Sequence, residues 1–104
     1  MANTKAFAAL ADPTRRAVFE RLAGGPQTVG ALAQGLPVSR PAVSQHLKVL
    51  KAARLVTDQA VGTRRIYRLD PDGVGALRAD LERFWNQALS AYKTIVEQQN
   101  EEDR

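Results

Sequence analysis

The sequence contains no cysteine and only one histidine, His46. Without thiols the chain has no disulfides, no thiolate zinc site, no iron–sulfur cluster and no cysteine nucleophile. A single histidine cannot by itself build a metal site or a catalytic triad, and the helical positions of Ser39 and Ser44 put no histidine or lysine base in reach as part of a triad. We therefore expect neither enzymatic activity nor a metal or other cofactor.

Long apolar runs are also missing. No stretch approaches the roughly 18 to 20 residues that cross a bilayer, and the N-terminus lacks the pattern of a signal peptide. The 104 residues are 44% hydrophobic and 25% charged, which is typical of one globular domain. The sequence thus predicts a cytoplasmic protein with no membrane partner, built as one domain over residues 1–99 with a frayed polar tail at 100–104.

Acidic residues are scarce in the middle of the chain. Residues 38–68 carry seven basic side chains and one acidic one, net +6, whereas residues 1–37 have net charge +2 and residues 69–104 have net charge −4. A basic block of this kind suits a polyanion such as nucleic acid. A solvated basic surface gives the same charge count, so the local pattern must decide between them.

Cap and breaker residues predict four helices in the first half of the chain. Asp12 followed by Pro13 is an N-cap with proline at the first helical position, and Gly24-Gly25-Pro26 is a strong stop. Thr28 and Ser39 are further caps, each followed by apolar residues at helical spacing. The expected helices lie at 3–10, about 13–23, 28–35 and 39–53.

A hairpin and a long helix are expected in the second half. Residues 55–60 and 65–69 have the length and composition of strands, and the loop 61–64 between them contains Gly62, which favours a turn. Apolar residues then recur at helical spacing from 74 to 99. The fold class is therefore mainly α with a small β-hairpin, in the order α-α-α-α-β-β-α. This is a winged helix-turn-helix, with the helix-turn-helix at 28–53 and the wing at 55–69.

The fourth helix offers a face suited to DNA. With Val43, Leu47 and Leu50 turned inward, its outer side and first turn carry a set of polar or small residues, and no acidic residue occurs from 39 to 53. Arginine can hold guanine, glutamine can hold adenine, and serine or lysine can bind phosphate. An ordinary polar surface is the less favoured alternative. The predicted contacts on this helix are Ser39, Arg40, Pro41, Ser44, Gln45 and Lys48.

The wing adds further basic side chains. Arg64 and Arg65 are expected at its tip and Arg68 on its strand, while strand alternation turns Tyr67 and Leu69 toward the core. Such arginines contact phosphates or the minor groove. They could instead keep an exposed hairpin soluble, an alternative that is stronger for Arg68 than for the tip pair.

The last helix has more apolar residues than a small domain usually hides, which predicts a homodimer. Intramolecular packing against the first helix is the alternative, and both can hold along different edges of the stripe. A ligand pocket beside Phe84, Trp85 and Tyr92 is a third, lesser interpretation, because aromatic residues at helical spacing are more often core. The residues predicted at the dimer interface are Phe7, Leu10, Leu77, Leu81, Phe84, Trp85, Leu89 and Tyr92.

The segment ALADPTRRAVFERLAGGPQTVGALAQGLPVSRPAVSQHLKVLKAARLV, followed by GTRRIYRLDP, resembles the ArsR family of bacterial winged-helix repressors. The resemblance covers nearly the whole chain. It implies a homodimer, with its first and last helices at the interface, that binds a partly palindromic operator in the bacterial nucleoid. The family's DNA-contact positions fall on Arg40, Pro41, Ser44, Gln45, Arg64 and Arg65.

The resemblance is to family members without a known metal site. The Cys-x-Cys pair of some metal sensors aligns with Thr28 and Gly30, and residues 74–99 contain no histidine for the other known site. The sequence does not choose between a small-molecule effector, a protein effector and none. The alternatives to a repressor are a winged-helix adaptor for proteins and a non-specific nucleoid-type DNA binder. Arg40 and Gln45 on a well-capped helix argue against the latter.

Overall fold

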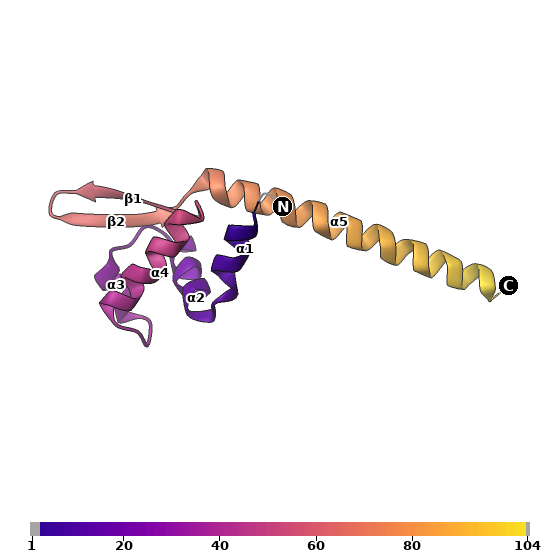
Figure 1. Cartoon of the computed structure of the whole chain (residues 1–104), viewed down its shortest axis with the longest axis horizontal. Coiled ribbons are helices and arrows are strands. Elements are labelled where there is room, and N and C mark those ends of the chain that lie inside the picture. The colour runs from indigo at the N-terminus through magenta and orange to yellow at the C-terminus, as the bar shows by residue number, and fades with distance from the viewer. Residues whose placement is uncertain (1–2, 104) are drawn as a thin grey trace.

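Four short helices form the first half of the chain (Figure 1). The computed structural model describes residues 3–103. The helices are α1 (Thr4–Ala11), α2 (Pro13–Ala23), α3 (Val29–Gln34) and α4 (Arg40–Ala52), each within a residue or two of its predicted place. The order of elements and the fold class are those predicted.

Local hydrogen bonds explain where these helices begin. Asp12, Thr28 and Ser39 each accept a bond from a backbone N–H three residues later, at 2.9, 3.2 and 3.3 Å. Such bonds satisfy N–H groups that the first turn of a helix leaves free. The bond from the backbone N–H of Arg15 also holds the pKa of the Asp12 carboxyl below its usual value. The predicted caps are therefore confirmed.

The core lies between these helices and the base of the hairpin. The predicted inward residues of α4, Val43, Leu47 and Leu50, are at most 1% exposed. They pack with apolar residues of α1, α2 and α3, and with Leu55 and Val56 where the chain enters the hairpin. α4 is thus fixed along one side, and its opposite side faces solvent.

The wing is an antiparallel hairpin of β1 (Val56–Val61) and β2 (Arg64–Leu69). The predicted four-residue loop is wrong, because Val61 and Arg64 pair as the last rung and only residues 62 and 63 form the turn. Gly62 has φ of 62°, a conformation that suits glycine in such a tight turn.

A non-local bridge fastens the wing to the helices. The backbone N–H of Gln27, between α2 and α3, donates to the Tyr67 carbonyl at 2.9 Å, and the N–H of Tyr67 donates back at 2.8 Å. The base of the hairpin is thereby tied to the helix-turn-helix, while its tip projects away from it (Figure 1).

The last helix, α5 (Pro71–Glu102), is longer than predicted at both ends. It begins at Pro71 because the Asp70 side chain accepts the Asp72 N–H at 3.0 Å. It runs on through Glu102, so the predicted frayed tail is wrong over residues 100–102. Arg104 lies outside the described residues.

The 32 residues of α5 span about 48 Å, at about 1.5 Å per residue. Most of this length stands clear of the other helices (Figure 1).

Gly73 sets how closely α5 approaches the end of α4. A Cβ at this position would overlap the backbone carbonyl oxygen of Arg54, whereas a Cβ at Gly75 meets nothing within 4 Å. We expect Gly73→Ala to destabilise the fold by about 1–3 kcal/mol, as overpacking does. Gly75→Ala, the matched control, should stabilise it by about 0.5–1 kcal/mol through helix propensity. Urea denaturation at fixed protein concentration measures both changes, and equal stabilities would contradict this account of the junction.

Candidate nucleic-acid interface

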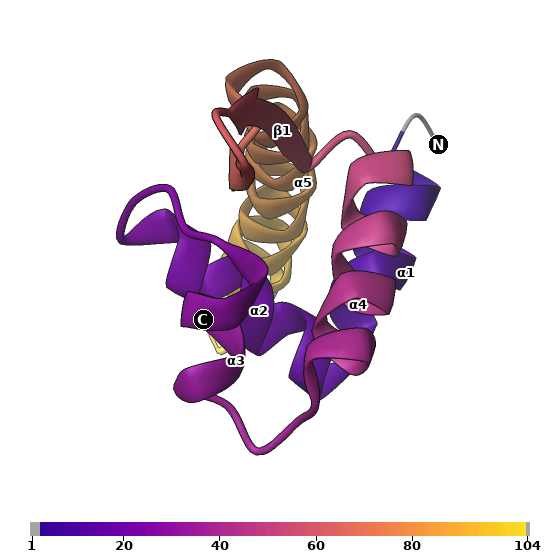
Figure 2. The same cartoon turned by 90° about the vertical axis from the view of Figure 1, so that its left-hand side faces the viewer.

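The outer side of α4 carries the predicted contact residues. Arg40, Pro41, Ser44, Gln45 and Lys48 are all exposed, as their helical phase requires. Seen from the end where the tip of the wing projects, α3, α4 and the hairpin lie on the same side of the molecule (Figure 2). The structure therefore groups the helix-turn-helix and the wing on one accessible surface.

Two residues at the start of α4 have partners within the chain. The Ser39 hydroxyl accepts the Ala42 N–H at 3.3 Å, which leaves its own O–H free to donate to an outside acceptor. The Arg40 side chain folds over α3, where a Cβ on Gly30 would stand 3.2 Å from one of its guanidinium nitrogens. The Arg40 guanidinium thus lies beside Gly30 of α3.

His46 and Lys51 lie on different sides of α4. His46 is half-buried at the edge of the apolar side of α4. Lys51, which the sequence analysis did not single out, is exposed on the same side as Ser44 and Lys48. The spacing 44, 48, 51 follows one face of a helix and was the signal that could have found it. The basic face of α4 thus extends through its last turn.

The wing presents two faces with different chemistry. Tyr67 and Leu69 pack against the core, as predicted. Arg65 alternates with them on that same face, whereas Arg64 and Arg68 lie on the opposite face. All three arginines are exposed. The two arginines predicted to act together at the tip therefore point to different sides of the hairpin.

A single carboxylate, Asp58 on β1, joins the wing to α4. Its Oδ1 lies 2.6 Å from Lys51 Nζ, and its Oδ2 lies 2.7 Å from a guanidinium nitrogen of Arg65. The Asp58 side chain is 7% exposed, while each cation remains 56% exposed. The hydrogen bonds from Lys51 and then from Arg65 hold the pKa of the Asp58 carboxyl below its usual range. Sequence reasoning missed this group, which we name the Asp58 triad (Lys51, Asp58 and Arg65).

The apolar stripe of α5 divides into a buried start and an exposed remainder. Leu77 is 6% exposed and belongs to the core of the chain itself, and Phe7 and Leu10 pack against that core. Beyond Leu77 the same stripe is uncovered. Its large side chains, between 47% and 67% exposed, are Leu81, Phe84, Trp85, Leu89, Tyr92 and Ile95.

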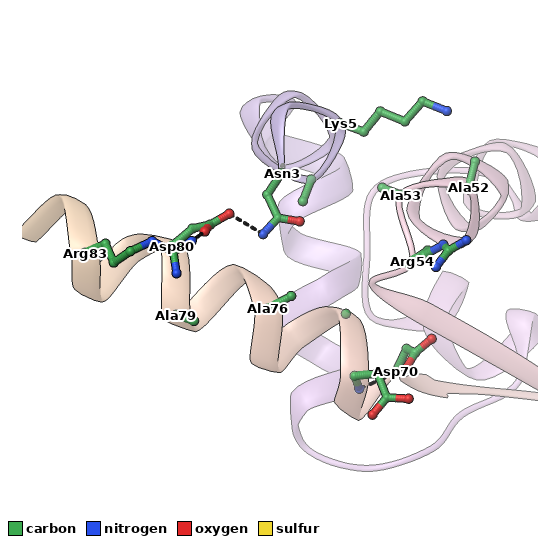
Figure 3. Close-up of a pocket in the computed structure, with 13 residues that line it drawn as sticks. Asn3, Lys5, Ala52, Ala53, Arg54, Asp70, Ala76, Ala79, Asp80 and Arg83 are labelled. Atoms are coloured by element: carbon green, nitrogen blue, oxygen red, sulfur yellow. Dashed lines mark hydrogen bonds and ion pairs between the residues drawn. The ribbon is translucent and has the colours of Figure 1, made fainter. Parts of the chain in front are cut away.

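Two hollows lie along α5. A mixed-charge cleft separates it from α1 and from the turn after α4, with alanines from all three segments among its lining. Asn3 and Arg83 both contact Asp80 at one end of this cleft, and Arg54 and Asp70 lie at the other (Figure 3). A shallower apolar hollow lies on α5 itself between Arg78 and Asn86. The sequence suggested a ligand pocket beside Phe84, Trp85 and Tyr92. Phe84 and Trp85 line this hollow, whereas Tyr92 lies outside it.

The described part of the chain has neither a membrane-spanning helix nor a cluster of metal-binding side chains. No helix within residues 3–103 is both long and apolar enough to cross a membrane. Over the same residues, no three histidine, aspartate or glutamate side chains gather in a group that could hold a metal ion.

Comparison with known proteins places the chain in a family. A helix-turn-helix domain family matches residues 10–59. The HTH-type transcriptional regulator Rv2034 of Mycobacterium tuberculosis is 61% identical over 98 residues, which are 94% of this chain and 92% of that protein. The ArsR-like transcriptional regulator from Rhodococcus sp. RHA1 superposes with a TM-score of 0.74 at 36% identity, over 90% of this chain and 92% of that one.

A further solved structure bears on assembly. The homodimeric winged helix-turn-helix DNA-binding domain from Mycobacterium bovis has a TM-score of 0.67 at 28% identity, over 85% of this chain and 82% of that one. The likeness to these three proteins covers 85% or more of this chain and so extends well beyond the helix-turn-helix. The chain thus belongs to the ArsR family of winged helix-turn-helix transcriptional regulators.

Proposed function

We propose that this regulator is a repressor that binds double-stranded DNA sequence-specifically, as a homodimer on a partly palindromic operator. The observation that carries the proposal is the outer face of α4, which is exposed, contains no acidic residue and lies on the same side of the molecule as the wing. The major groove of DNA, about 12 Å wide, admits one such helix. The proposed site of action is the bacterial cytoplasm, on the nucleoid.

The contacts divide by chemistry. Gln45 can pair with adenine through two hydrogen bonds, and Arg40, once it leaves α3, can pair with guanine in the same way. Ser39 and Ser44 suit a phosphate or a base edge, and Lys48 suits a phosphate. Pro41, which has no polar side-chain group, would make apolar contacts with DNA at the first turn of α4. On the wing, Arg64 is free to reach the backbone or the minor groove, whereas Arg65 is held by Asp58.

The exposed part of the α5 stripe is the proposed dimer interface. Moving a fully exposed large apolar side chain out of water contributes about 1.5–3 kcal/mol. These six are 47–67% exposed, so each contributes a part of that, and six on each chain provide a strong driving force. A two-fold dimer would present two copies of α4, and copies spaced about 34 Å apart meet successive major grooves on one side of the DNA. Phe7 and Leu10 border this stripe in the proposal. We leave Leu77 out, because it is already buried within its own chain.

Relief of repression requires an effector or a change in protein concentration. The mixed-charge cleft is one place where a small molecule would touch both α5 and the turn after α4, but no feature of it selects a ligand. We therefore propose no effector chemistry.

Selection of bound duplexes from a random pool by the purified full chain tests the proposal. We expect enrichment of an inverted repeat whose half-sites are about one helical turn apart. The enriched duplex should bind at least about 10³-fold more tightly than a random one, with an affinity that falls linearly in a plot of log affinity against log salt. Salt-dependent binding without enrichment would indicate a non-specific DNA binder. Absence of binding would favour a protein-interaction adaptor.

A further inference from the structure

The Asp58 triad lies between the two elements that the proposed function brings to DNA. Lys51 comes from the outer side of α4, and Arg65 comes from the wing, and both bind the same carboxylate. Asp58 is the only acidic residue between positions 38 and 68. Its placement therefore differs from that of the chain's other acids, which lie outside the basic block.

The triad changes the electrostatics between α4 and the wing. A carboxylate facing DNA repels phosphate, yet Asp58 is only 7% exposed and is covered by the two cations. Two cations and one carboxylate have a net charge of +1. Without the carboxylate the two cations alone would have a net charge of +2, with two long side chains free to follow a phosphate. Asp58 thus lowers both the charge and the number of mobile cations beside α4.

We propose that Asp58 restrains sequence-independent DNA binding by holding Lys51 and Arg65 away from phosphates. This inference rests on the proposed DNA-binding function. Phosphate contacts add affinity on every sequence alike, whereas base contacts distinguish sequences. A carboxylate that occupies two cations therefore reduces the share of binding that carries no sequence information. Asp58 acts through Lys51 and Arg65 and is a positioning residue.

The competing interpretation is a salt bridge that only stabilises the hairpin. Partly exposed pairs of this kind contribute little to folding. Under that interpretation, removing the charge shifts the thermal melt slightly and leaves the salt dependence of DNA binding unchanged. The salt dependence is therefore the measurement that separates the two.

The test uses the Asp58→Asn variant of the full chain on a random-sequence duplex, titrated between 50 and 200 mM salt. Each additional phosphate contact steepens the log–log slope by about 0.9. Release of one or two cations should therefore steepen the slope by about 1–2, and the affinity of the variant should fall about three- to twelvefold more than that of the wild type over this salt range. Affinity for the random duplex at 50 mM should rise.

Matched variants separate local from global effects. Glu97→Gln makes the same change in net charge on an exposed position of α5, and it should leave the slope unchanged. The double variant Lys51→Ala with Asp58→Asn should show about half the additional slope. A slope for Asp58→Asn equal to or shallower than that of the wild type overturns the proposal.

A second pair of variants tests the proposal without altering Asp58. If Arg65 is held away from phosphate, Arg65→Gln changes the slope by less than about half as much as Arg64→Gln, which should remove about 0.9. Equal losses from both arginines overturn the proposal. If the wild type binds no duplex at all, it is the proposed function that fails.

Discussion

Replacing both Leu81 and Trp85 by glutamate is expected to yield a folded monomer with greatly weakened operator binding. These side chains are 48% and 62% exposed in the single chain, so their loss costs the protomer little packing. In a dimer they would be buried, and two charges on each helix would face the same pair from the partner. A monomer binds one half-site at a time and loses the effect of linkage, which is worth about 10²–10⁴ in affinity.

A control variant with the same two added charges separates the effect of their position on α5 from the effect of the charge itself. Gln87→Glu with Ser90→Glu also adds two negative charges to exposed positions of α5, but at 100° per residue these residues lie on the side away from the apolar stripe. That variant should remain dimeric. Light scattering gives the mass of each variant, circular dichroism checks the helix, and titration of the selected duplex gives the affinity. A dimer that survives Leu81→Glu with Trp85→Glu would move the interface elsewhere on the molecule.

What the sequence predicted well is local. N-caps, proline at the first helical position and the 3.6-residue period are all set within one or two turns, and they located α2, α3 and α4 and the buried side of α4. The start of α5 was available by the same logic, since Asp70-Pro71 repeats the Asp12-Pro13 pattern that starts α2. Gly62 indicated the hairpin, but the length of the turn decides which residues pair. Because the turn is shorter than predicted, Arg64 belongs to the strand and not to the loop.

What the sequence did not predict depends on contacts between distant residues. The bridge between Gln27 and Tyr67 joins residues forty apart, and no local pattern marks it. The Asp58 triad requires knowing which face of the wing turns toward α4. The stripe of α5 is continuous in the sequence, yet the rest of the domain covers only its start, so Leu77 is core and Leu81 is not. Only the packed fold shows where that boundary falls.

The second large effect concerns recognition of bases by α4. We expect Gln45→Ala and Arg40→Ala each to relax the preferred base at one position of each half-site, at a cost of about 1–3 kcal/mol per lost contact on the selected duplex. A dimer carries the change twice, so the total loss on a symmetric operator is about double. Lys48→Ala is the control, because loss of a phosphate contact weakens all duplexes alike.

The two substitutions should also differ from each other, because Arg40 and Gln45 start from different states. Gln45 is exposed and its side chain has no hydrogen-bond partner among residues 3–103, whereas Arg40 lies over Gly30 and must give up that packing when it reaches a base. Gly30→Ala would crowd the guanidinium against α3 and displace it, so it should alter binding only where Arg40 is present. Repeating the selection with each variant, and with Gly30→Ala in the Arg40→Ala background, measures this coupling. Equal losses on selected and random duplexes for Arg40→Ala and Gln45→Ala would contradict base recognition by this face and leave α4 with a purely electrostatic role.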